Sequence, residues 1–409
     1  MSNEIKNKVV PKLRFPEFRE SEGWEELSLG KIAEIITGNT PNTSDSSNYR
    51  GSRLFVSPSD ISEGRYVTQT KTTLSEKGYS HTRHIKENSV LFVCIGSTIG
   101  KIGQNKYECS TNQQINSLVP YEGHSSDFLY SALEFKASSI ATIAGKHAVP
   151  IINKSLFSSV LVSFPPLEEQ QKIADCLSSL DELITAQSQK LQALKTHKKG
   201  LMQQLFPAEG ETVPKLRFAE FRNSGEWEEK TLGSVCKSFS GGTPSTTQRE
   251  YYGGNIPFIR SAEIDKYTTE LFLTSEGLNN SSAKLVNQGD ILVALYGANS
   301  GDVALAKIAG AINQAILCLK SQESNSFIYQ FLLFKKDWIV STYIQGGQGN
   351  LSGDIVKSIK LLFPKPEEQQ KIADCLSSLD EQISAQTEKI EALKTHKKGL
   401  MQALFPSEL

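Results

Sequence analysis

The sequence predicts an α+β protein in which two mixed α/β domains are joined by two long antiparallel coiled-coil helices, arranged as a pseudo-two-fold internal repeat. Three observations support this prediction: a nearly literal internal repeat, a heptad pattern within it, and a globular composition. The chain has 409 residues, of which 38% are hydrophobic and 22% are charged. Its length corresponds to two or three domains, and its formal net charge of −1 argues neither for nor against nucleic-acid binding.

The repeat consists of short blocks that return almost unchanged while the segments between them have diverged. The blocks are VPKLRF at 10–15 and 213–218, EEQQKIADCLSSLDE at 168–182 and 367–381, and KTHKKGLMQ at 195–203 and 394–402. Such a chain alternates variable and constant segments. We therefore expect a variable domain over 1–165, a constant helix over 166–207, a second variable domain over 208–364 and a second constant helix over 365–409.

The constant segments have the heptad pattern of coiled-coil helices. Apolar residues occupy eight of the ten a and d positions in each copy. The central seam positions are Ile173, Leu177, Leu180, Ile184, Gln187, Leu191 and Leu194 in the first copy, and Ile372, Leu376, Leu379, Ile383, Gln386, Ile390 and Leu393 in the second. Pro165, Pro166 and Glu168 mark the start of the first helix, and Pro207 marks its end.

The charges beside the seam favour an antiparallel pairing of the two helices. A parallel pairing would bring lysines of the two copies together, whereas an antiparallel pairing brings opposite charges together. The expected antiparallel contacts are Asp181 with Lys394 and Lys195 with Asp380, around a central polar layer of Gln187 and Gln386. Such a buried polar layer is of the kind that fixes helix register.

The variable domains have the mixed pattern of an α/β fold. Apolar runs at 90–95 and 291–296 end in glycine-rich loops, as buried strands do, and 127–140 and 326–340 have helical spacing. The polar segments 38–51 and 241–254 are expected to form long loops.

Catalytic motifs are missing from the sequence. Residues 96–101, GSTIGK, have three residues between the glycines where a phosphate-binding loop has four, so a tight turn after a strand is the better interpretation. Glu134 and Lys136 form an isolated E-x-K without an upstream acidic partner, which argues against a nuclease centre. The six cysteines contain no C-x-x-C pair, which indicates reduced thiols rather than a zinc site. We expect no catalytic, cofactor or metal site.

The whole chain resembles the specificity (S) subunit of type I restriction-modification systems. The resemblance rests on the variable–constant alternation and on these motifs: FPPLEEQ at 164–170, FPKPEEQ at 363–369, the KxxKKGLMQxLFP ends of both constant segments, and the WExxxLG openings at Trp24 and Trp227. In that family the variable segments are target-recognition domains, and each reads one half of a split DNA sequence. The constant helices set the spacer between the half-sites and dock partner subunits.

The resemblance implies a non-catalytic subunit of a cytoplasmic complex for host defence. The implied partners are double-stranded DNA, two modification (M) subunits that hold S-adenosylmethionine and methylate adenine, and restriction (R) subunits that use ATP and Mg. No membrane association is expected, since no apolar stretch is long enough to span a bilayer. The alternative is a coiled-coil scaffold or solitary S subunit without active DNA targeting; an enzyme with an unrecognised site is the weakest alternative.

Base edges are read by basic and amide side chains and by hydroxyl groups, mostly on loops. The candidates in the first domain are Arg53, Arg65, Lys71, Arg83, Ser97, Thr98, Lys101, Lys146 and His147, and those in the second are Arg249, Arg260, Asn299, Ser300, Gln345, Gln348 and Asn350. Asn112-Gln113 recurs as Asn313-Gln314 although target readers should differ between the copies. These two pairs are therefore expected to be structural hydrogen bonders.

Overall fold

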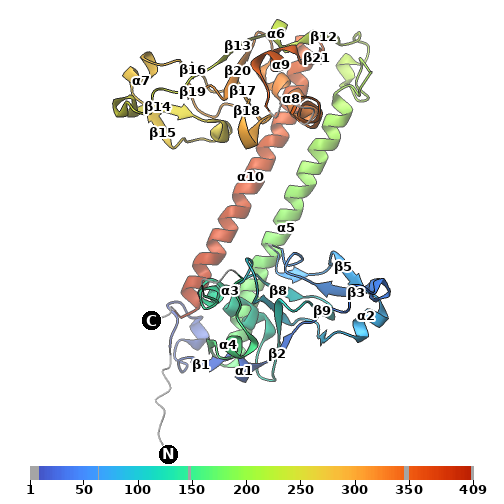
Figure 1. The fold of residues 1–409 in the computed structure, drawn as a ribbon, viewed down its shortest axis with the longest axis vertical. Helices are drawn as coiled ribbons and strands as arrows, with labels where there is room; N and C mark the ends of the chain where they lie inside the picture. Colours follow the sequence, from blue (N-terminus) through green and yellow to red (C-terminus); the bar gives the residue numbers. More distant parts are fainter. Residues whose placement is uncertain (1–8, 63, 146–148, 345–349, 407–409) are drawn as a thin grey trace, which may run out of the picture. The chain divides into compact units, whose positions relative to one another are not determined.

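A computed structural model describes residues 9–62, 64–145, 149–344 and 350–406 (Figure 1). The chain forms two compact units: unit 1 comprises residues 1–189 and 387–409, and unit 2 comprises residues 190–386. Two 39-residue helices, α5 (Leu167–Leu205) and α10 (Pro366–Leu404), each contribute residues to both units. No helix in the described part of the chain is long and apolar enough to cross a membrane.

The two long helices follow the predicted heptad seam. Every a and d position from 173 to 205 and from 372 to 404 is buried or half-buried, whereas the residues between them are mostly exposed. Leu183, which lies outside the seam, is 40% exposed although it is apolar. Burial therefore follows the heptad position rather than the residue type alone.

Within each unit, the start of one long helix packs against the end of the other, as expected for an antiparallel pair. In unit 1, Ile173 and Leu177 of α5 share a core with Met401 and Leu404 of α10. In unit 2, the equivalent residues Ile372 and Leu376 of α10 share a core with Met202 and Leu205 of α5. The two cores thus repeat one arrangement.

The ion pairs between the helices lie one turn away from the predicted ones. In unit 1, Lys397 Nζ lies 2.6 Å from Asp181 Oδ1, and in unit 2, Lys198 Nζ lies 2.6 Å from Asp380 Oδ1. The prediction placed Lys394 and Lys195 opposite these aspartates. The difference arises because each paired lysine occupies an a position, where its buried stem carries the ammonium group to the partner helix.

The variable part of unit 1 contains three antiparallel or mixed sheets. The first pairs β1 (Glu25–Ser28) with β11 (Leu161–Phe164). The second has the order β2 (Ala33–Thr37), β10 (Ile115–Pro120), β7 (Val90–Val93), β8 (Ile102–Asn105) and β4 (Tyr66–Val67). The third has the order β5 (Thr72–Leu74), β3 (Tyr49–Val56), β9 (Cys109–Thr111) and β6 (His84–Ile85). The helices are α1 (Leu29–Ile32), α2 (Glu76–Ser80), α3 (Ser126–Thr142) and α4 (Lys154–Ser158).

Unit 2 repeats this topology, except that its second sheet has four strands where that of unit 1 has five. Its two-stranded sheet pairs β12 (Glu228–Thr231) with β21 (Lys360–Phe363). Its second sheet has the order β13 (Cys236–Ser240), β20 (Ile316–Ser321), β17 (Ile291–Ala294) and β18 (Val303–Leu305). Its third has the order β15 (Leu271–Leu273), β14 (Tyr252–Ile259), β19 (Gly310–Ile312) and β16 (Lys284–Val286). The helices are α6 (Leu232–Val235), α7 (Ser275–Asn279), α8 (Asn325–Ile339) and α9 (Gly353–Ser358).

The core of each unit joins variable and constant segments. In unit 1, Phe405 follows α10 and packs beside Trp24, Phe128 and Phe135, with ring centroids 5.3–6.2 Å apart. The predicted strands and helices are present, with β7 and β17 buried at every position. The predicted loops 38–51 and 241–254 are shorter than expected, because β3 and β14 begin inside them at Tyr49 and Tyr252.

Candidate functional site

A duplicated framework of hydrogen bonds holds the polar loops of both units. Thr40 Oγ1 donates to Gln113 Oε1 at 2.7 Å, and Thr243 Oγ1 donates to Gln314 Oε1 at 2.6 Å. The asparagine before each glutamine accepts a bond from the backbone N–H two residues later, at 3.1 Å in both units. The prediction that these Asn-Gln pairs are structural is confirmed.

A second duplicated feature is a buried ion pair that we call the clasp. In unit 1, the guanidinium of Arg14 donates two bonds to the carboxylate of Glu169, at 2.7 and 2.6 Å. In unit 2, Arg217 and Glu368 make the same pair at 2.6 Å for both bonds. The side chains of the unit 1 pair are 4% and 0% exposed. Sequence reasoning found these arginines only as part of the repeated hexapeptide.

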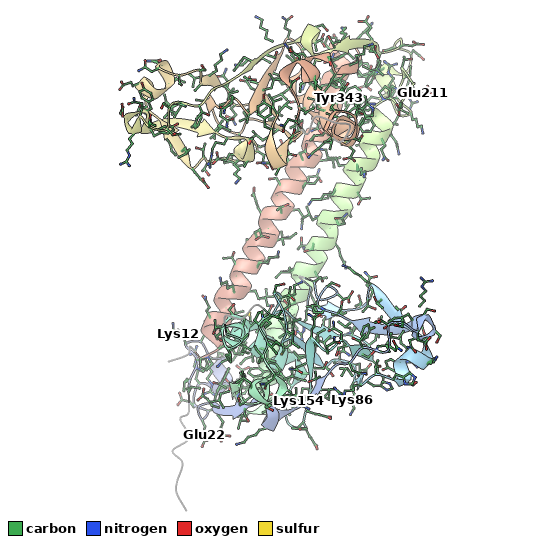
Figure 2. The ribbon with its side chains drawn as sticks, viewed as in Figure 1. Lys12, Glu22, Lys86, Lys154, Glu211 and Tyr343 are labelled. Atoms are coloured by element: carbon green, nitrogen blue, oxygen red, sulfur yellow. The ribbon has the colours of Figure 1, made fainter. Side chains whose placement is uncertain are left out.

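The clasps tie the constant hexapeptides to the long helices. The backbone N–H of Leu13 donates to Ala403 O at the end of α10, and Leu216 donates to Gln204 O at the end of α5. Each hexapeptide therefore bridges the start of one helix and the end of the other within its unit. Lys12 of this segment is exposed beside the end of α10 (Figure 2).

The apolar residues of the hexapeptides lie on the surface in both units. Val10 is 62% exposed and Leu13 is 43% exposed, while Val213 and Leu216 are each 40% exposed. Scattered apolar residues are ordinary on protein surfaces. Here, however, the same apolar pair is exposed twice beside the same constant helices, so each unit presents the same constant surface.

Arg65, a candidate DNA reader, is instead a structural residue. Its side chain is 2% exposed, and it donates to Asp127, to Gln104 Oε1 at 2.8 Å and to Ser178 Oγ at 2.5 Å. Ser178 belongs to α5, so Arg65 joins the variable domain to the constant helix. The prediction that Arg65 reads a base is corrected, because its donors are already used inside the protein.

Several other candidates have partners within their own domain. Arg53 donates to both oxygens of Glu76 at 2.8 and 3.2 Å, and Arg260 donates to Glu263 and Glu270. Arg83 is exposed but donates to Thr37 O at 2.5 Å. Lys101 is exposed, with Nζ 3.4 Å from the carbonyl oxygens of Pro58 and Ile61. Each of these cations would exchange a protein partner for DNA on binding.

The glycine loops after β7 and β17 are tight turns. Gly96 and Gly100 have φ values of +95° and +92°, and a Cβ at Gly100 would lie 3.2 Å from Ala137 O. In unit 2, Ser300 Oγ donates to Leu295 O at 2.8 Å, which gives this candidate a structural role. Ser97 is exposed, and Thr98 and Asn299 are half-buried.

Of the remaining candidates, some are exposed and the others lie outside the described residues. Lys71, Arg249 and Asn350 are exposed. Lys146, His147, Gln345 and Gln348 lie outside the described residues. The structure therefore does not gather the sixteen candidates into one site; in each unit they are spread over several loops.

A cavity of about 520 Å³ in unit 1 lies where α3 meets the long helices. Lys397 Nζ lies 2.6 Å both from Glu134 Oε2 and from Asp181 Oδ1, so two carboxylates share one ammonium group. Burial raises the pKa of Glu134, and Lys397 opposes that rise. In unit 2, the aspartate of the corresponding Lys198–Asp380 pair accepts a second bond from a neutral amide, Gln330 Nε2 to Asp380 Oδ2 at 2.6 Å.

The described residues provide no group of three or more His, Cys, Asp or Glu side chains that could hold a metal ion. Burial raises the pKa of the Cys94, Cys109 and Cys318 thiols to about 12 and that of Cys236 to about 11. Thiols with such pKa values are protonated at neutral pH and are poor nucleophiles and metal ligands.

Comparisons with known proteins agree with this architecture. Residues 21–196 and 224–395 match the family described as Type I restriction modification DNA specificity domain. The chain is 25% identical over 408 residues to the type I restriction enzyme MjaVIII specificity subunit of Methanocaldococcus jannaschii, covering 96% of this chain and 94% of that one. It is 32% identical over 151 residues to the HindI specificity subunit of Haemophilus influenzae, covering 36% of this chain and 33% of that one.

Solved structures share the fold at low sequence identity. The S subunit of a type I restriction-modification system from M. genitalium superposes with a TM-score of 0.67 at 15% identity, covering 98% of this chain and all of that chain. A chain from a study of complex assembly in the type I system gives a TM-score of 0.52 at 18% identity, with the same coverage.

Proposed function

Because the chain belongs to the family of type I restriction-modification DNA specificity domains, we propose that it reads a bipartite DNA target for a methyltransferase complex. Each variable domain would read one half-site, and the two constant helices would set the spacer between the halves. The domains are assigned to residues 1–165 and 208–364, and the helices to 166–207 and 365–409.

One observation carries this proposal: the two units share a framework and a constant surface, but the surfaces of their variable parts differ. The clasps, the Thr–Gln bonds and the strand orders correspond in both units, except that β4 at the edge of the second sheet of unit 1 has no counterpart in the described part of unit 2. The side chains that the framework displays differ: Arg53 of unit 1 stands where unit 2 has Ile256, and Lys71 stands where unit 2 has Glu270. A scaffold protein has no need to vary one part while it keeps the rest, whereas a bipartite reader does.

The constant surface supports docking of the same partner twice. Exposed Val10 and Leu13 recur as Val213 and Leu216, next to identical exposed stretches of the long helices. Two equal surfaces on one chain fit two copies of one partner. We assign them to two modification subunits, which would supply S-adenosylmethionine and adenine methylation; restriction subunits would add ATP- and Mg-dependent cleavage. The complex would be cytoplasmic.

The chain itself would be non-catalytic in this complex. A single domain of this size can read few base pairs, since each good bidentate contact contributes about 1–3 kcal/mol of discrimination. Two domains on one spacer multiply that discrimination. Remaining candidates for direct contacts are Arg53, Lys71, Arg83, Ser97, Thr98, Lys101, Arg249, Arg260, Asn299, Asn350 and, outside the described residues, Lys146, His147, Gln345 and Gln348.

The test is to express the chain with its modification subunit in a host that lacks adenine methylation and to sequence the methylated adenines. The proposal predicts one motif of two short specific halves separated by a fixed non-specific spacer. Methylation without a motif, or a motif with a single continuous half, would contradict it. A scaffold or solitary subunit without DNA targeting would give no methylation above the modification subunit alone.

A further inference from the structure

The arginines of the chain fall into three groups by their partners. All ten lie within the described residues. Arg14 and Arg217 form the clasps, and Arg53, Arg65, Arg83 and Arg260 donate to acceptors in their own unit. The four without a side-chain hydrogen bond, ion pair or ring contact are Arg19, Arg50, Arg222 and Arg249, and all four are exposed.

Only two of these four free arginines belong to the variable surface. Arg19 and Arg222 are counterparts that follow the constant hexapeptides, so they are the same in both copies. Arg249 lies in the turn just before β14, and Arg50 is the second residue of β3, directly after the equivalent turn of unit 1. We call residues 45–50, which contain the 3-10 turn η2 (Ser46–Asn48) and the first two residues of β3, the η2 turn; residues 248–253, which contain η4 (Arg249–Tyr251) and the first two residues of β14, are the η4 turn.

The two turns have the same backbone and different side chains. In unit 1, Ser75 N–H donates to Asn48 O at 3.0 Å and its Oγ donates to Ser47 O at 2.7 Å. In unit 2, Thr274 N–H donates to Tyr251 O at 3.0 Å and its Oγ1 donates to Glu250 O at 2.9 Å. Ser75 and Thr274 are also the N-caps of α2 and α7, so each helix start fixes its turn.

Two further contacts leave little freedom to either turn. Tyr49 Oη donates to Pro41 O at 2.9 Å, and Tyr252 Oη donates to Pro244 O at 2.7 Å. A Cβ at Gly78 of α2 would lie 2.0 Å from Asn48 O, so the helix approaches the turn too closely for any other residue. The turns are therefore rigid platforms whose displayed residues differ: SSNYR in unit 1 against REYYG in unit 2.

Arg50 occupies a backbone conformation that ordinarily calls for glycine. Its φ is +63°, in the left-handed region, and the equivalent position of unit 2 is Gly253 with a φ of +82°. A long side chain in this conformation is strained, and such strain persists where it serves a function. The β3–α2 region lies at the end of unit 1 away from α5 (Figure 1), and Arg50 itself is exposed.

From these observations we infer that the η2 and η4 turns are base-reading elements and that Arg50 and Arg249 each recognise a guanine, one in each half-site. Arginine is the side chain that most often reads guanine, through two bonds to O6 and N7 in the major groove. A rigid turn presents the guanidinium group to DNA without having to become ordered on binding. This inference rests on the proposed DNA-reading function and deepens it.

The test compares Arg50→Gly and Arg249→Ala with the matched controls Arg19→Gly and Arg222→Ala, each expressed with the modification subunit. The readout is the motif obtained by sequencing methylated adenines. Arg50→Gly should lower discrimination at a single G·C position of one half-site by about 10- to 100-fold, and Arg249→Ala should do the same in the other half-site. The controls should leave the motif unchanged.

Arg50→Gly also tests whether a change in specificity could result from misfolding. The substitution introduces glycine, the residue at the equivalent position Gly253 of unit 2, and so removes the strain of a left-handed φ. Its thermal unfolding midpoint should equal or exceed that of the unsubstituted chain while its specificity falls. An unchanged motif would overturn the inference. Uniformly weaker methylation with an unchanged motif would also overturn it, if the slope of log DNA-binding constant against log salt concentration becomes less steep by about one. That result would identify a contact with a phosphate rather than with a base. A parent chain without any bipartite motif would overturn the proposed function as well.

Discussion

We expect substitutions in the clasp of unit 1 to be among those that lower the stability of the folded chain most. Replacing Arg14 by Ala leaves the carboxylate of Glu169 buried at 0% exposure without its two donors. It also removes the donors to Ser21 O at 2.7 Å and Glu22 O at 2.9 Å. Breaking a buried ion pair on one side typically costs about 3–5 kcal/mol, because the remaining charge has no compensation. We expect a loss in this range for unit 1.

Urea unfolding followed by tryptophan fluorescence measures this loss. Trp24 is fully buried in unit 1, so a chain in which Trp227 and Trp338 are replaced by Phe reports on unit 1 alone. Arg14→Ala should lower the free energy of unfolding seen by Trp24. Arg19→Ala removes an exposed arginine of the same segment and should change it by no more than about 0.5 kcal/mol.

A double-mutant cycle with Glu169 separates the pair from its surroundings. The double variant Arg14→Ala, Glu169→Ala should lose less free energy of unfolding than the sum of the losses of the two single variants, because it buries no uncompensated charge. A loss below about 1 kcal/mol for Arg14→Ala alone would be that of an exposed ion pair and would refute the reasoning from burial.

Two further predictions concern the long helices and the shared lysine. Inserting one heptad between Leu191 and Leu194 adds about 10.5 Å of helix, which corresponds to about three base pairs at 3.4 Å each, so the spacer should lengthen while both half-sites persist; an unchanged spacer in the methylation motif would show that the helices do not set it. The pKa of Glu134 in the folded chain lies above its ordinary value of 4.5, so protonation of Glu134 stabilises the folded state. This stabilisation is fully present below pH 4.5 and is lost as pH rises through the pKa of the folded chain. Glu134→Gln, which keeps a polar partner for Lys397, should lose less stability than the parent chain between pH 4 and pH 7 in urea unfolding; parallel pH profiles would contradict the prediction.

The repeat and the seam made the architecture predictable. A literal repeat fixes the equivalence of the two units, and the heptad positions of residues such as Ile173 and Leu177 determine which side of each helix is buried. The lysines that pair with Asp181 and Asp380 lie one helical turn from the predicted ones. A heptad assignment does not take into account how far a lysine side chain extends from its position. The clasp could not be predicted, since nothing in the hexapeptide says which carboxylate Arg14 will meet.

The surface readers were predicted least well, and for a physical reason. Arg65 and Arg50 look alike in sequence, yet one is buried among four partners and the other is exposed and strained. Whether an arginine is free depends on carboxylates and carbonyls that are distant along the chain. A comparison of the two copies could have found Arg50, because Gly253 stands at the same position of the repeat.

The central claim is that each variable domain reads its half of the target independently, and a domain exchange tests it most directly. Residues 208–364 are replaced by the corresponding segment of a relative with a different target, and the methylated adenines of the host are sequenced with the hybrid chain and its modification subunit present. The account predicts a motif in which one half is new while the other half and the spacer length are those of the parent chain. A motif in which both halves change, or in which the parent motif persists, would contradict it.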